Sequence, residues 1–251
     1  MSVSRPPKYR CALALMARVP LPGIDETKTG LSPPLTSTEA EALQHRFVRD
    51  TAMNISDIVE AGRGEGVAVF TPARAESTVK ELVPKGFKLF PQRGETLGNV
   101  LANSIDDLLK RGFSSVCLIN CDSPTLPRTL IEVAIESLTR PGDRMVLGAV
   151  DGGGYYLIGL KQAPGDLFDR ISSSTSNVVA HTTARAAAIG LKVEMLPPWY
   201  GVNNAKTLNR LCRDLLGPDR TDQAYPAPFT HQYLARLIET EGPEYLSSGL
   251  S

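Results

Sequence analysis

Asp122 is the residue of this sequence whose position best suits chemistry. It follows a short apolar run, residues 116–119, that predicts a buried strand, and a Ser-Pro pair comes directly after it. In open α/β sheets, ligands bind beyond the carboxyl ends of the strands. A carboxylate at that place can hold a divalent cation, which in turn binds phosphates. The alternative is that Asp122 caps the next helix, a position that aspartate also favours.

Asp151 is a second acidic residue in a similar position. Three glycines follow it, and the apolar residues 155–160 then predict another strand. Consecutive glycines are costly to order, so this run indicates backbone that passes close to a ligand or to another segment. Two aspartates at strand ends predict a metal–diphosphate site or an acid/base pair, which makes Asp122 and Asp151 the candidate catalytic residues. The candidate substrate-binding residues of this run are Gly152, Gly153, Gly154 and Tyr155.

A long loop rich in proline and glycine follows the first predicted strand, residues 11–17, and extends over residues 18–35. Long ordered loops are often functional, and Gly23 lets the backbone approach a ligand closely. Arg18 and Lys28 supply positive charge for a phosphate. The loop is not a Walker loop, because the pattern G-x-x-x-x-G-K is absent. A flexible surface loop is the alternative interpretation.

Short strands and helices alternate along the chain, which predicts a mainly parallel sheet flanked by helices in a three-layer α/β sandwich. A capping box at Thr36 and Glu39 opens the first long helix. Residues 9–216 are predicted to form one domain. Residues 217–251 are predicted to be a C-terminal extension with one modest helix near 232–238, packed on the domain or on a partner subunit of a homodimer.

Composition excludes several classes of protein. The chain of 251 residues has 27 basic and 27 acidic side chains, so its zero net charge argues against a broad nucleic-acid footprint. No apolar run approaches the length of a membrane span, and residues 1–8 are predicted to be a disordered lead without a signal peptide's apolar segment. The four cysteines lack the spacing of a zinc site or a disulfide framework. We therefore expect reduced thiols and a cytoplasmic location.

Several motifs, taken in order, resemble a known family. They are Pro20-Leu21-Pro22-Gly23, Lys28-Thr29-Gly30-Leu31, Leu97-Gly98, Asn120-Cys121-Asp122-Ser123-Pro124, the run 151–160, and Ser174-Thr175 with Val178. Over about residues 11–216 the chain is similar to the bacterial glycosyltransferase-A-type proteins named arsenosugar-biosynthesis glycosyltransferases. That family is in turn similar to nucleotidyltransferases such as phospholactate guanylyltransferase.

The resemblance implies a nucleotide-diphospho-sugar transferase (glycosyltransferase-A) fold and a division of roles among the motifs. It implies a nucleotide or nucleotide-sugar substrate, a small-molecule acceptor, and Mg2+ or Mn2+ held by Asp122 and Asn203. Ser174 and Thr175 join the candidates for substrate binding. The segment 92–98 also leads into a predicted helix, where backbone N–H groups could face a ligand, although a plain connection is the alternative. The candidate nucleotide-binding residues are Arg18, Pro22, Gly23, Lys28, Thr29, Thr96, Leu97 and Gly98.

The sequence departs from the family pattern at three places. Gly30 stands where the family has an arginine, Asn99 lies where another arginine is usual, and Gly201-Val202-Asn203 replaces Asp-Val-Asp. These positions would normally provide phosphate charge and a metal carboxylate, so their loss weakens the case for triphosphate binding. Asn203 still offers a neutral oxygen to a cation.

Three functional interpretations follow, in this order. The first is a metal-assisted transferase that acts on a nucleotide-activated sugar and a small acceptor. The second is a nucleotidyltransferase that joins a nucleoside triphosphate to a small phosphorylated or acidic metabolite. The third is a non-catalytic member that keeps the fold and nucleotide binding. The sequence does not identify the nucleotide, the sugar or the acceptor.

Overall fold

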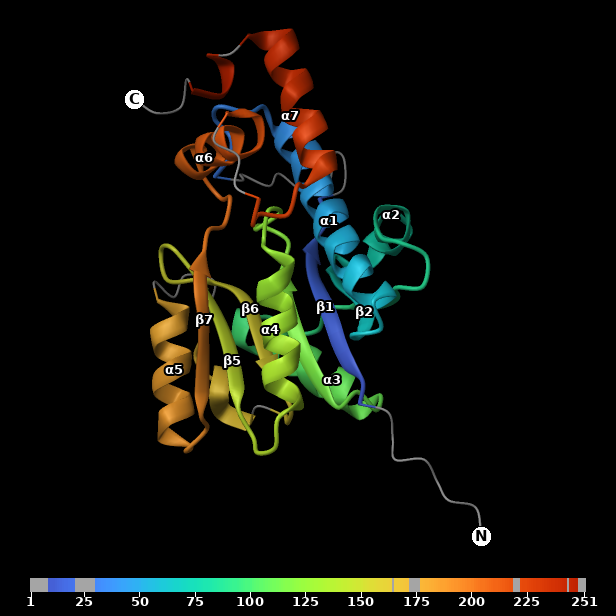
Figure 1. The fold of residues 1–251 in the computed structure, drawn as a ribbon, viewed down its shortest axis with the longest axis vertical. Coiled ribbons are helices and arrows are strands. Elements are labelled where there is room, and N and C mark those ends of the chain that lie inside the picture. The colour runs from blue at the N-terminus through green and yellow to red at the C-terminus, as the bar shows by residue number, and fades with distance from the viewer. Residues whose placement is uncertain are drawn as a thin grey trace.

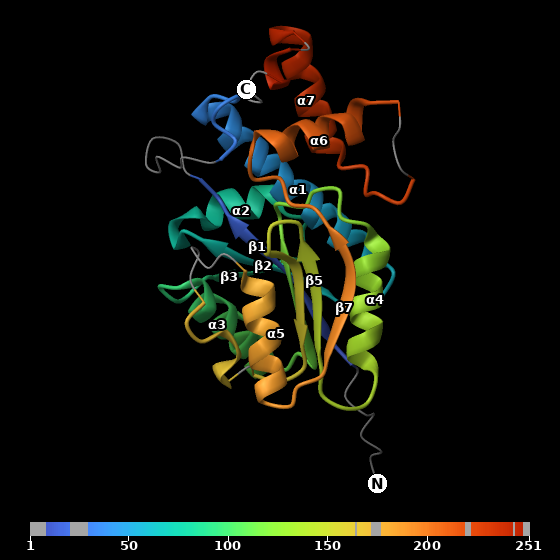
Figure 2. The same cartoon turned by 90° about the vertical axis from the view of Figure 1, so that its left-hand side faces the viewer.

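A seven-stranded sheet forms the centre of the computed structural model, which describes residues 9–20, 30–163, 165–171, 177–218, 222–242 and 244–247. The strand order is β3-β2-β1-β4-β6-β5-β7, and helices cover both faces (Figures 1 and 2). All neighbouring strands pair in parallel except β6, which is antiparallel to both β4 and β5. The predicted α/β sandwich with a mainly parallel sheet is confirmed.

The strands predicted at residues 11–17, 116–119 and 155–160 are present as β1, β4 and β6, with bounds that differ by one residue at most. The strands are β1 (Cys11–Arg18), β2 (Glu65–Thr71), β3 (Lys88–Pro91), β4 (Ser115–Asn120), β5 (Met145–Val150), β6 (Tyr155–Leu160) and β7 (Val193–Trp199).

The helices connect these strands and continue after the last one. None of the described helices combines the length and the apolar character that a membrane span requires. The α-helices are α1 (Ser37–Glu60), α2 (Glu76–Leu82), α3 (Leu97–Lys110), α4 (Arg128–Thr139), α5 (Val178–Ala188), α6 (Ala205–Leu216) and α7 (Pro228–Glu241). The short 3-10 helices are η1 (Ala73–Ala75), η2 (Gly165–Phe168) and η3 (Tyr245–Ser247).

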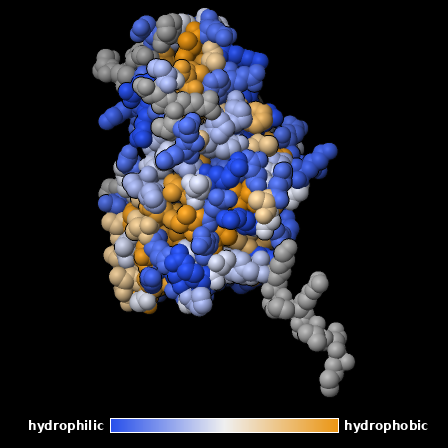
Figure 3. Space-filling view, in the orientation of Figure 1, coloured by the Kyte–Doolittle hydropathy of each residue, from blue (hydrophilic) through white to orange (hydrophobic). Residues whose placement is uncertain are grey.

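Alternate residues of β1 serve the two faces of the sheet. Leu13 and Leu15 belong to the core beneath α1 and α4, whereas Ala12 and Ala14 belong to the core beneath α3 and α5. A strand buried on both faces reads as a continuous apolar run, as β1 does. The outer surface is more mixed, and hydrophobic and hydrophilic residues are interspersed over the face that carries α4 (Figure 3).

The first turn of α1 is capped as the sequence predicts. Thr36 accepts a hydrogen bond from the Glu39 N–H, and the Glu39 carboxylate accepts one from the Thr36 N–H. The C-terminal segment adds to this cap, because Tyr245 Oη donates to Glu39 Oε2 at 2.6 Å and Tyr233 Oη donates to the Glu39 carbonyl at 3.2 Å. The C-terminal segment therefore holds the start of α1 in place.

Helix α7 packs beside α1 (Figure 1) and is longer than the helix predicted at 232–238. Asp50, a buried residue of α1, accepts the N–H groups of Phe229 and Thr230 at 3.0 and 2.7 Å and so caps the start of α7. The cap comes from a residue about 180 positions away, and no local pattern in the sequence could indicate it.

The pH dependence of stability provides a test of this buried cap. Burial raises the pKa of Asp50 to about 6, although the hydrogen bonds from Thr230 and Phe229 oppose the shift. An aspartate in the unfolded chain titrates near pH ~4. The folded protein therefore binds more protons between about pH 4 and pH 6, and the contribution of Asp50 to the free energy of unfolding decreases as pH rises through that window.

We expect the Asp50→Asn variant to lose this contribution, which amounts to about 3 kcal/mol at most. Urea unfolding at a series of pH values should give a flatter profile for the variant than for the wild type between about pH 4 and pH 6. Glu60→Gln, an exposed change on the same helix, is the matched control and should leave the profile unchanged. Equal slopes for Asp50→Asn and the wild type would contradict the assignment.

Candidate functional site

A cleft of about 610 Å³ opens at the carboxyl ends of the central strands. It is lined by Arg18 at the end of β1, Asn120 at the end of β4, and Asp151 directly after β5. Asp122 and Asn203 also line it. The structure thus brings both candidate catalytic residues and the candidate metal ligand Asn203 into one cleft, at the edge of the sheet where α/β proteins bind ligands.

The turn that carries Asp122 is tied to the segment that follows β7. Ser123 Oγ, which is buried, donates to the Tyr200 carbonyl at 2.8 Å, and the Val202 N–H donates to the Asp122 carbonyl at 2.7 Å. Thr125 Oγ1 donates to Tyr200 Oη at 3.2 Å. These bonds fix the backbone of Asp122 against the segment that leads to Asn203.

Asp122 does not cap the next helix. Helix α4 begins at Arg128, and its N-cap residue is Pro127, which makes no side-chain cap bond. Asp122 is instead exposed within the cleft, where desolvation by the surrounding protein raises its pKa and a weak hydrogen bond from the Cys121 thiol opposes the shift. The carboxylate is therefore available to a ligand in the cleft.

Asp151 faces a cation on α6. Arg210 Nη1 lies 3.5 Å from Asp151 Oδ2, and Arg210 Nε lies 3.7 Å from Asp214 Oδ2. The Arg210 guanidinium also lies over the ring of Tyr200, 3.9 Å from its centroid. Exposed ion pairs of this kind add little to stability. Their consequence here is local, because they keep a positive charge beside Asp151.

The glycine run forms the turn between β5 and β6. Gly152 and Gly153 have φ values of +94° and +90°, a conformation that other residues adopt only with strain. The Gly154 carbonyl accepts the Val150 N–H at 2.9 Å, and the Gly153 carbonyl accepts the Val179 N–H at 3.1 Å. The glycines therefore serve the backbone of the turn itself, and all three also line the cleft together with Tyr155.

The three candidates at the start of α3 have different surroundings. Thr96 is the N-cap residue and accepts the Asn99 N–H at 3.2 Å, while Leu97 lines the cleft. The Gly98 N–H donates to the Ile171 carbonyl at 3.0 Å, and a Cβ atom at Gly98 would overlap the Phe168 carbonyl oxygen. Close packing against the backbone of 168–171 therefore explains this glycine, and its N–H is already bonded within the protein.

Two departures from the family pattern touch each other. A Cβ atom at Gly30 would lie far inside van der Waals contact of the Asn203 carbonyl oxygen. Asn203 in turn belongs to the start of α6, where its N–H donates to Thr207 Oγ1 at 3.0 Å and its Oδ1 accepts from Asn204 Nδ2 at 2.9 Å. With this backbone, no side chain fits at position 30.

Six of the candidate residues lie outside the described residues, namely Pro22, Gly23, Lys28, Thr29, Ser174 and Thr175. Within the described ranges, no group of three or more His, Cys, Asp or Glu side chains is arranged to hold a metal ion. The oxygen donors of the cleft are instead two exposed carboxylates, Asp122 and Asp151, together with amide groups such as Asn203. Such a set fits a hard cation that keeps part of its water shell, as Mg2+ does.

Sequence reasoning did not find Arg210 and Tyr200. Arg210 lies on a helix, 59 residues along the chain from its partner Asp151, and its spacing from neighbouring residues is that of an ordinary amphipathic helix. Tyr200 contributes its ring, over which the Arg210 guanidinium lies, and its carbonyl, which accepts the hydrogen bond from Ser123. No pattern of residues in the sequence indicates either contact.

Comparisons with known proteins agree with this fold. The family described as "Uncharacterized protein conserved in bacteria (DUF2064)" matches residues 54–175. No curated protein sequence matches the chain significantly. A crystal structure from Desulfovibrio desulfuricans G20, provisionally described as a nucleotide-diphospho-sugar transferase, superposes with a TM-score of 0.78 at 23% identity, over 94% of this chain and 98% of that chain.

Two further solved structures share the fold at lower similarity. A cytidylyltransferase from Leptospira borgpetersenii serovar Hardjo-bovis (strain JB197) gives a TM-score of 0.54 at 11% identity, over 95% of this chain and 97% of that one. A CMP:2-keto-3-deoxy-manno-octonic acid synthetase solved with CTP gives 0.50 at 14% identity, over 80% and 96%. At these identities the likeness establishes the fold, and the chemistry has to be argued from the cleft.

The contact between Gly30 and Asn203 leads to a test with a matched pair of variants. Gly30→Ala should lower the free energy of unfolding by about 1–3 kcal/mol, because the added methyl group forces the backbone near Asn203 to move. Gly201→Ala should be nearly neutral, since the nearest atoms to a Cβ there lie 3.9 Å away. Urea unfolding of both variants measures the difference. Equal stability of the two would contradict the packing described here.

Proposed function

We propose that this protein is a transferase that acts on a nucleotide-activated sugar and passes the sugar to a small acceptor with the help of a divalent metal ion. The observation that carries the proposal is the placement of Asp122. Its carboxylate is exposed in the cleft at the end of β4, and hydrogen bonds to the segment after β7 hold its backbone. A fixed carboxylate at this edge of an α/β sheet is suited to a metal–diphosphate site.

The nucleotide would occupy the cleft beside Arg18 and Leu97. A volume of about 610 Å³ lies within the range of ~300–1,000 Å³ for small-molecule sites. Arg18 lines the cleft and supplies one positive charge for a phosphate. Lys28 and the backbone near Gly23 supply further contacts in the proposal, as the resemblance implies. The glycine turn and Tyr155 would contact the sugar or the acceptor.

The metal ion would be Mg2+ or Mn2+, with Asp122 as its charged ligand and Asn203 as a neutral one. When bound, it neutralises charge on the leaving diphosphate without any proton transfer. Asp122 and the backbone that holds it would orient the diphosphate. Because Asn203 adds no charge, the affinity for the metal is expected to be weak until nucleotide is present.

Asp151 would act on the acceptor. It is exposed at the rim of the same cleft, where it can accept a hydrogen bond or a proton from an acceptor hydroxyl. Arg210 lies beside it, with Nη1 3.5 Å from Asp151 Oδ2, and can help to orient the carboxylate. The proposal places the enzyme in the cytoplasm, and the four cysteines, all of them free thiols, are consistent with a reducing compartment.

Nucleotidyl transfer is the second candidate, favoured by the fold that the chain shares with a cytidylyltransferase. In that reaction, Asp122 and Asp151 would guide the metal ion and a nucleoside triphosphate. Isotope tracing separates the two reactions, because sugar transfer releases the nucleoside diphosphate whereas nucleotidyl transfer leaves the nucleoside monophosphate joined to the acceptor. Absence of both turnover and nucleotide binding would favour a non-catalytic role instead.

The Asp122→Asn variant tests the metal site. An amide is a poor ligand for a hard cation, so we expect the enhancement of nucleotide binding by Mg2+ or Mn2+ to fall by ~10-fold or more, on the scale of a damaged metal site. Calorimetry with a panel of nucleotides and nucleotide sugars, with and without the metal ion, measures the effect.

Asp106→Asn is the matched control for Asp122→Asn. Asp106 is paired with Lys110 on the exposed side of α3, away from the lining of the cleft. This variant should bind like the wild type. If Asp122→Asn folds normally and keeps full metal-dependent binding, the metal role of Asp122 is wrong.

The Lys28→Ala variant tests the proline- and glycine-rich loop. Removing the ammonium group should weaken nucleotide binding by about 1–3 kcal/mol, the scale of a hydrogen bond to a charged group. Lys110→Ala on the exposed side of α3 serves as the control. Unchanged affinity in Lys28→Ala would mean that this lysine does not contact the phosphates.

A further inference from the structure

Two cysteines far apart in the sequence lie side by side in the central sheet. Cys11 and Cys117 belong to the neighbouring parallel strands β1 and β4, and their Sγ atoms are 3.9 Å apart. Both residues are buried. They lie near the amino ends of these strands, whereas the candidate cleft opens at the carboxyl ends. The thiol pair is therefore separate from the site proposed for the nucleotide.

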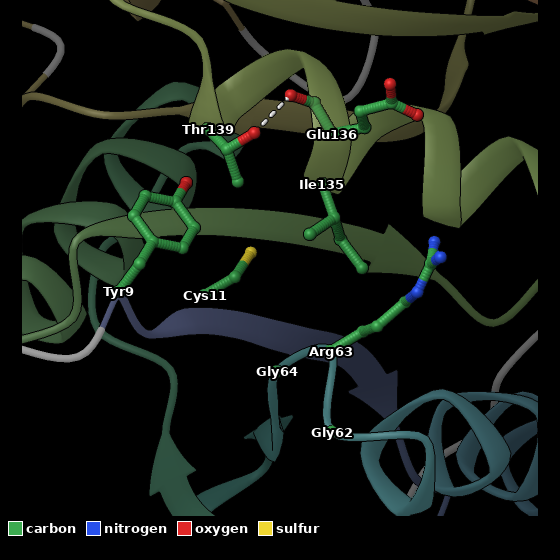
Figure 4. A pocket seen from close by; sticks show the side chains of 8 residues that line it. All are labelled: Tyr9, Cys11, Gly62, Arg63, Gly64, Ile135, Glu136 and Thr139. Carbon is green, nitrogen blue, oxygen red and sulfur yellow. Dashed lines mark hydrogen bonds between the residues drawn. The ribbon is translucent and has the colours of Figure 1, made fainter.

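Cys11, although almost fully buried, is one of the residues that line a pocket of about 300 Å³. The pocket is also lined by Tyr9, Arg63 and residues of α4 such as Ile135 (Figure 4). In that view, the sulfur atom of Cys11 points into the space between Tyr9 and Ile135. Cys117 is next to this sulfur and does not itself line the pocket.

The hydrogen bonds around the pair affect the two thiols differently. The bond with the Cys117 thiol lowers the pKa of Cys11, burial opposes this, and the Ser115 hydroxyl lowers it further. The same bond, together with burial, raises the pKa of Cys117 well above its ordinary value, so Cys117 would lose its proton only when a metal ion binds. Tyr9 Oη donates to Ser115 Oγ at 2.6 Å, so a chain of donors leads from the pocket wall to Cys11. The thiolate is the form of cysteine that binds metals.

We propose that Cys11 and Cys117 form a binding site for a soft metal ion of the Cu(I) or Zn(II) class. With metal–sulfur bonds of ~2.3 Å, two sulfur atoms 3.9 Å apart subtend an angle of about 116° at the metal, which lies between tetrahedral and trigonal geometry. The two thiols are thus placed for chelation without movement of the strands. Each thiol releases one proton, and no oxidation or reduction takes place.

Because Cys11 lines the pocket, water or a small thiol in the pocket would have to complete the coordination of the metal ion. Sulfur ligands select soft ions and are poor ligands for Mg2+. The oxygen donors of the cleft have the opposite preference. The protein would therefore hold two classes of metal ion at the two ends of the same pair of strands, and the thiol site would exist whether or not the protein is a transferase.

Titration of the reduced full-length protein with Cd(II) tests the site, because cadmium is a soft ion whose bonds to thiolates absorb in the near ultraviolet. We expect this thiolate-to-cadmium band to saturate at one ion per chain and to decrease when Zn(II) competes. An excess of Mg2+ should not change it. Absence of the band in wild-type protein whose thiols are reduced would overturn the proposal.

Cys11→Ser and Cys117→Ser should each weaken cadmium binding by more than ~100-fold. Losing a residue that only hydrogen-bonds to a metal ligand typically costs ~10–100-fold, and these two residues are proposed to be the ligands themselves. Cys212→Ser, which changes the half-buried cysteine of α6, is the matched control and should bind like the wild type. Cadmium binding that survives in a folded Cys11→Ser variant would overturn the site.

A measurement on the wild type avoids dependence on the folding of the variants. Cadmium should protect Cys11 from alkylation, as mapped by mass spectrometry of the modified peptides, and should leave the alkylation of Cys212 unchanged. Equal alkylation of Cys11 with and without saturating cadmium would contradict the proposal, whatever the stability of the serine variants.

Discussion

The candidate site depends on the bonds between the turn after β4 and the segment after β7. Ser123 Oγ donates to the Tyr200 carbonyl, and the Val202 N–H donates to the Asp122 carbonyl. These strands are not neighbours, because β6 and β5 lie between them in the sheet. The two bonds therefore span the carboxyl edge of the sheet and bring Asp122 and Asn203, which come from distant strands, to one cleft. A buried, bonded backbone positions these side chains more firmly than exposed ion pairs would.

The central pair of strands, β1 and β4, has different chemistry at its two ends. The carboxyl ends carry Arg18 and Asn120 into a polar cleft with an exposed carboxylate, which suits hard ions and phosphates. The amino ends carry two buried thiols, which suit soft ions. Because β1 and β4 run parallel, their amino ends lie together and their carboxyl ends lie together. The sulfur donors and the oxygen donors are therefore separated along the length of these two strands. The difference in donor atoms, sulfur at one end and oxygen at the other, would give each site its own preference among ions.

The sequence predicted most of the fold because its signals were local. The alternation of strands and helices, the capping box at Thr36 and the apolar run of β1 each depend on residues close together in the chain. The strand ends that carry Asp122 and Asp151 were predictable for the same reason. The cap that Asp50 provides for α7 and the pairing of Cys11 with Cys117 join residues more than 100 positions apart. They became visible only when the fold brought the partners together.

Glycines show most clearly where reasoning from sequence reaches its limit, because a missing side chain does not reveal what occupies its place. At Gly98 the neighbour is the backbone of Phe168, and at Gly30 it is the carbonyl of Asn203. The second case bears on function. A side chain at position 30 would overlap the Asn203 carbonyl, so an arginine there would require the 201–204 segment to take another course. Among the described residues that line the cleft, Arg18 is the one cation, so the phosphate charge of the proposed site has to be met by Arg18 rather than by a side chain at position 30.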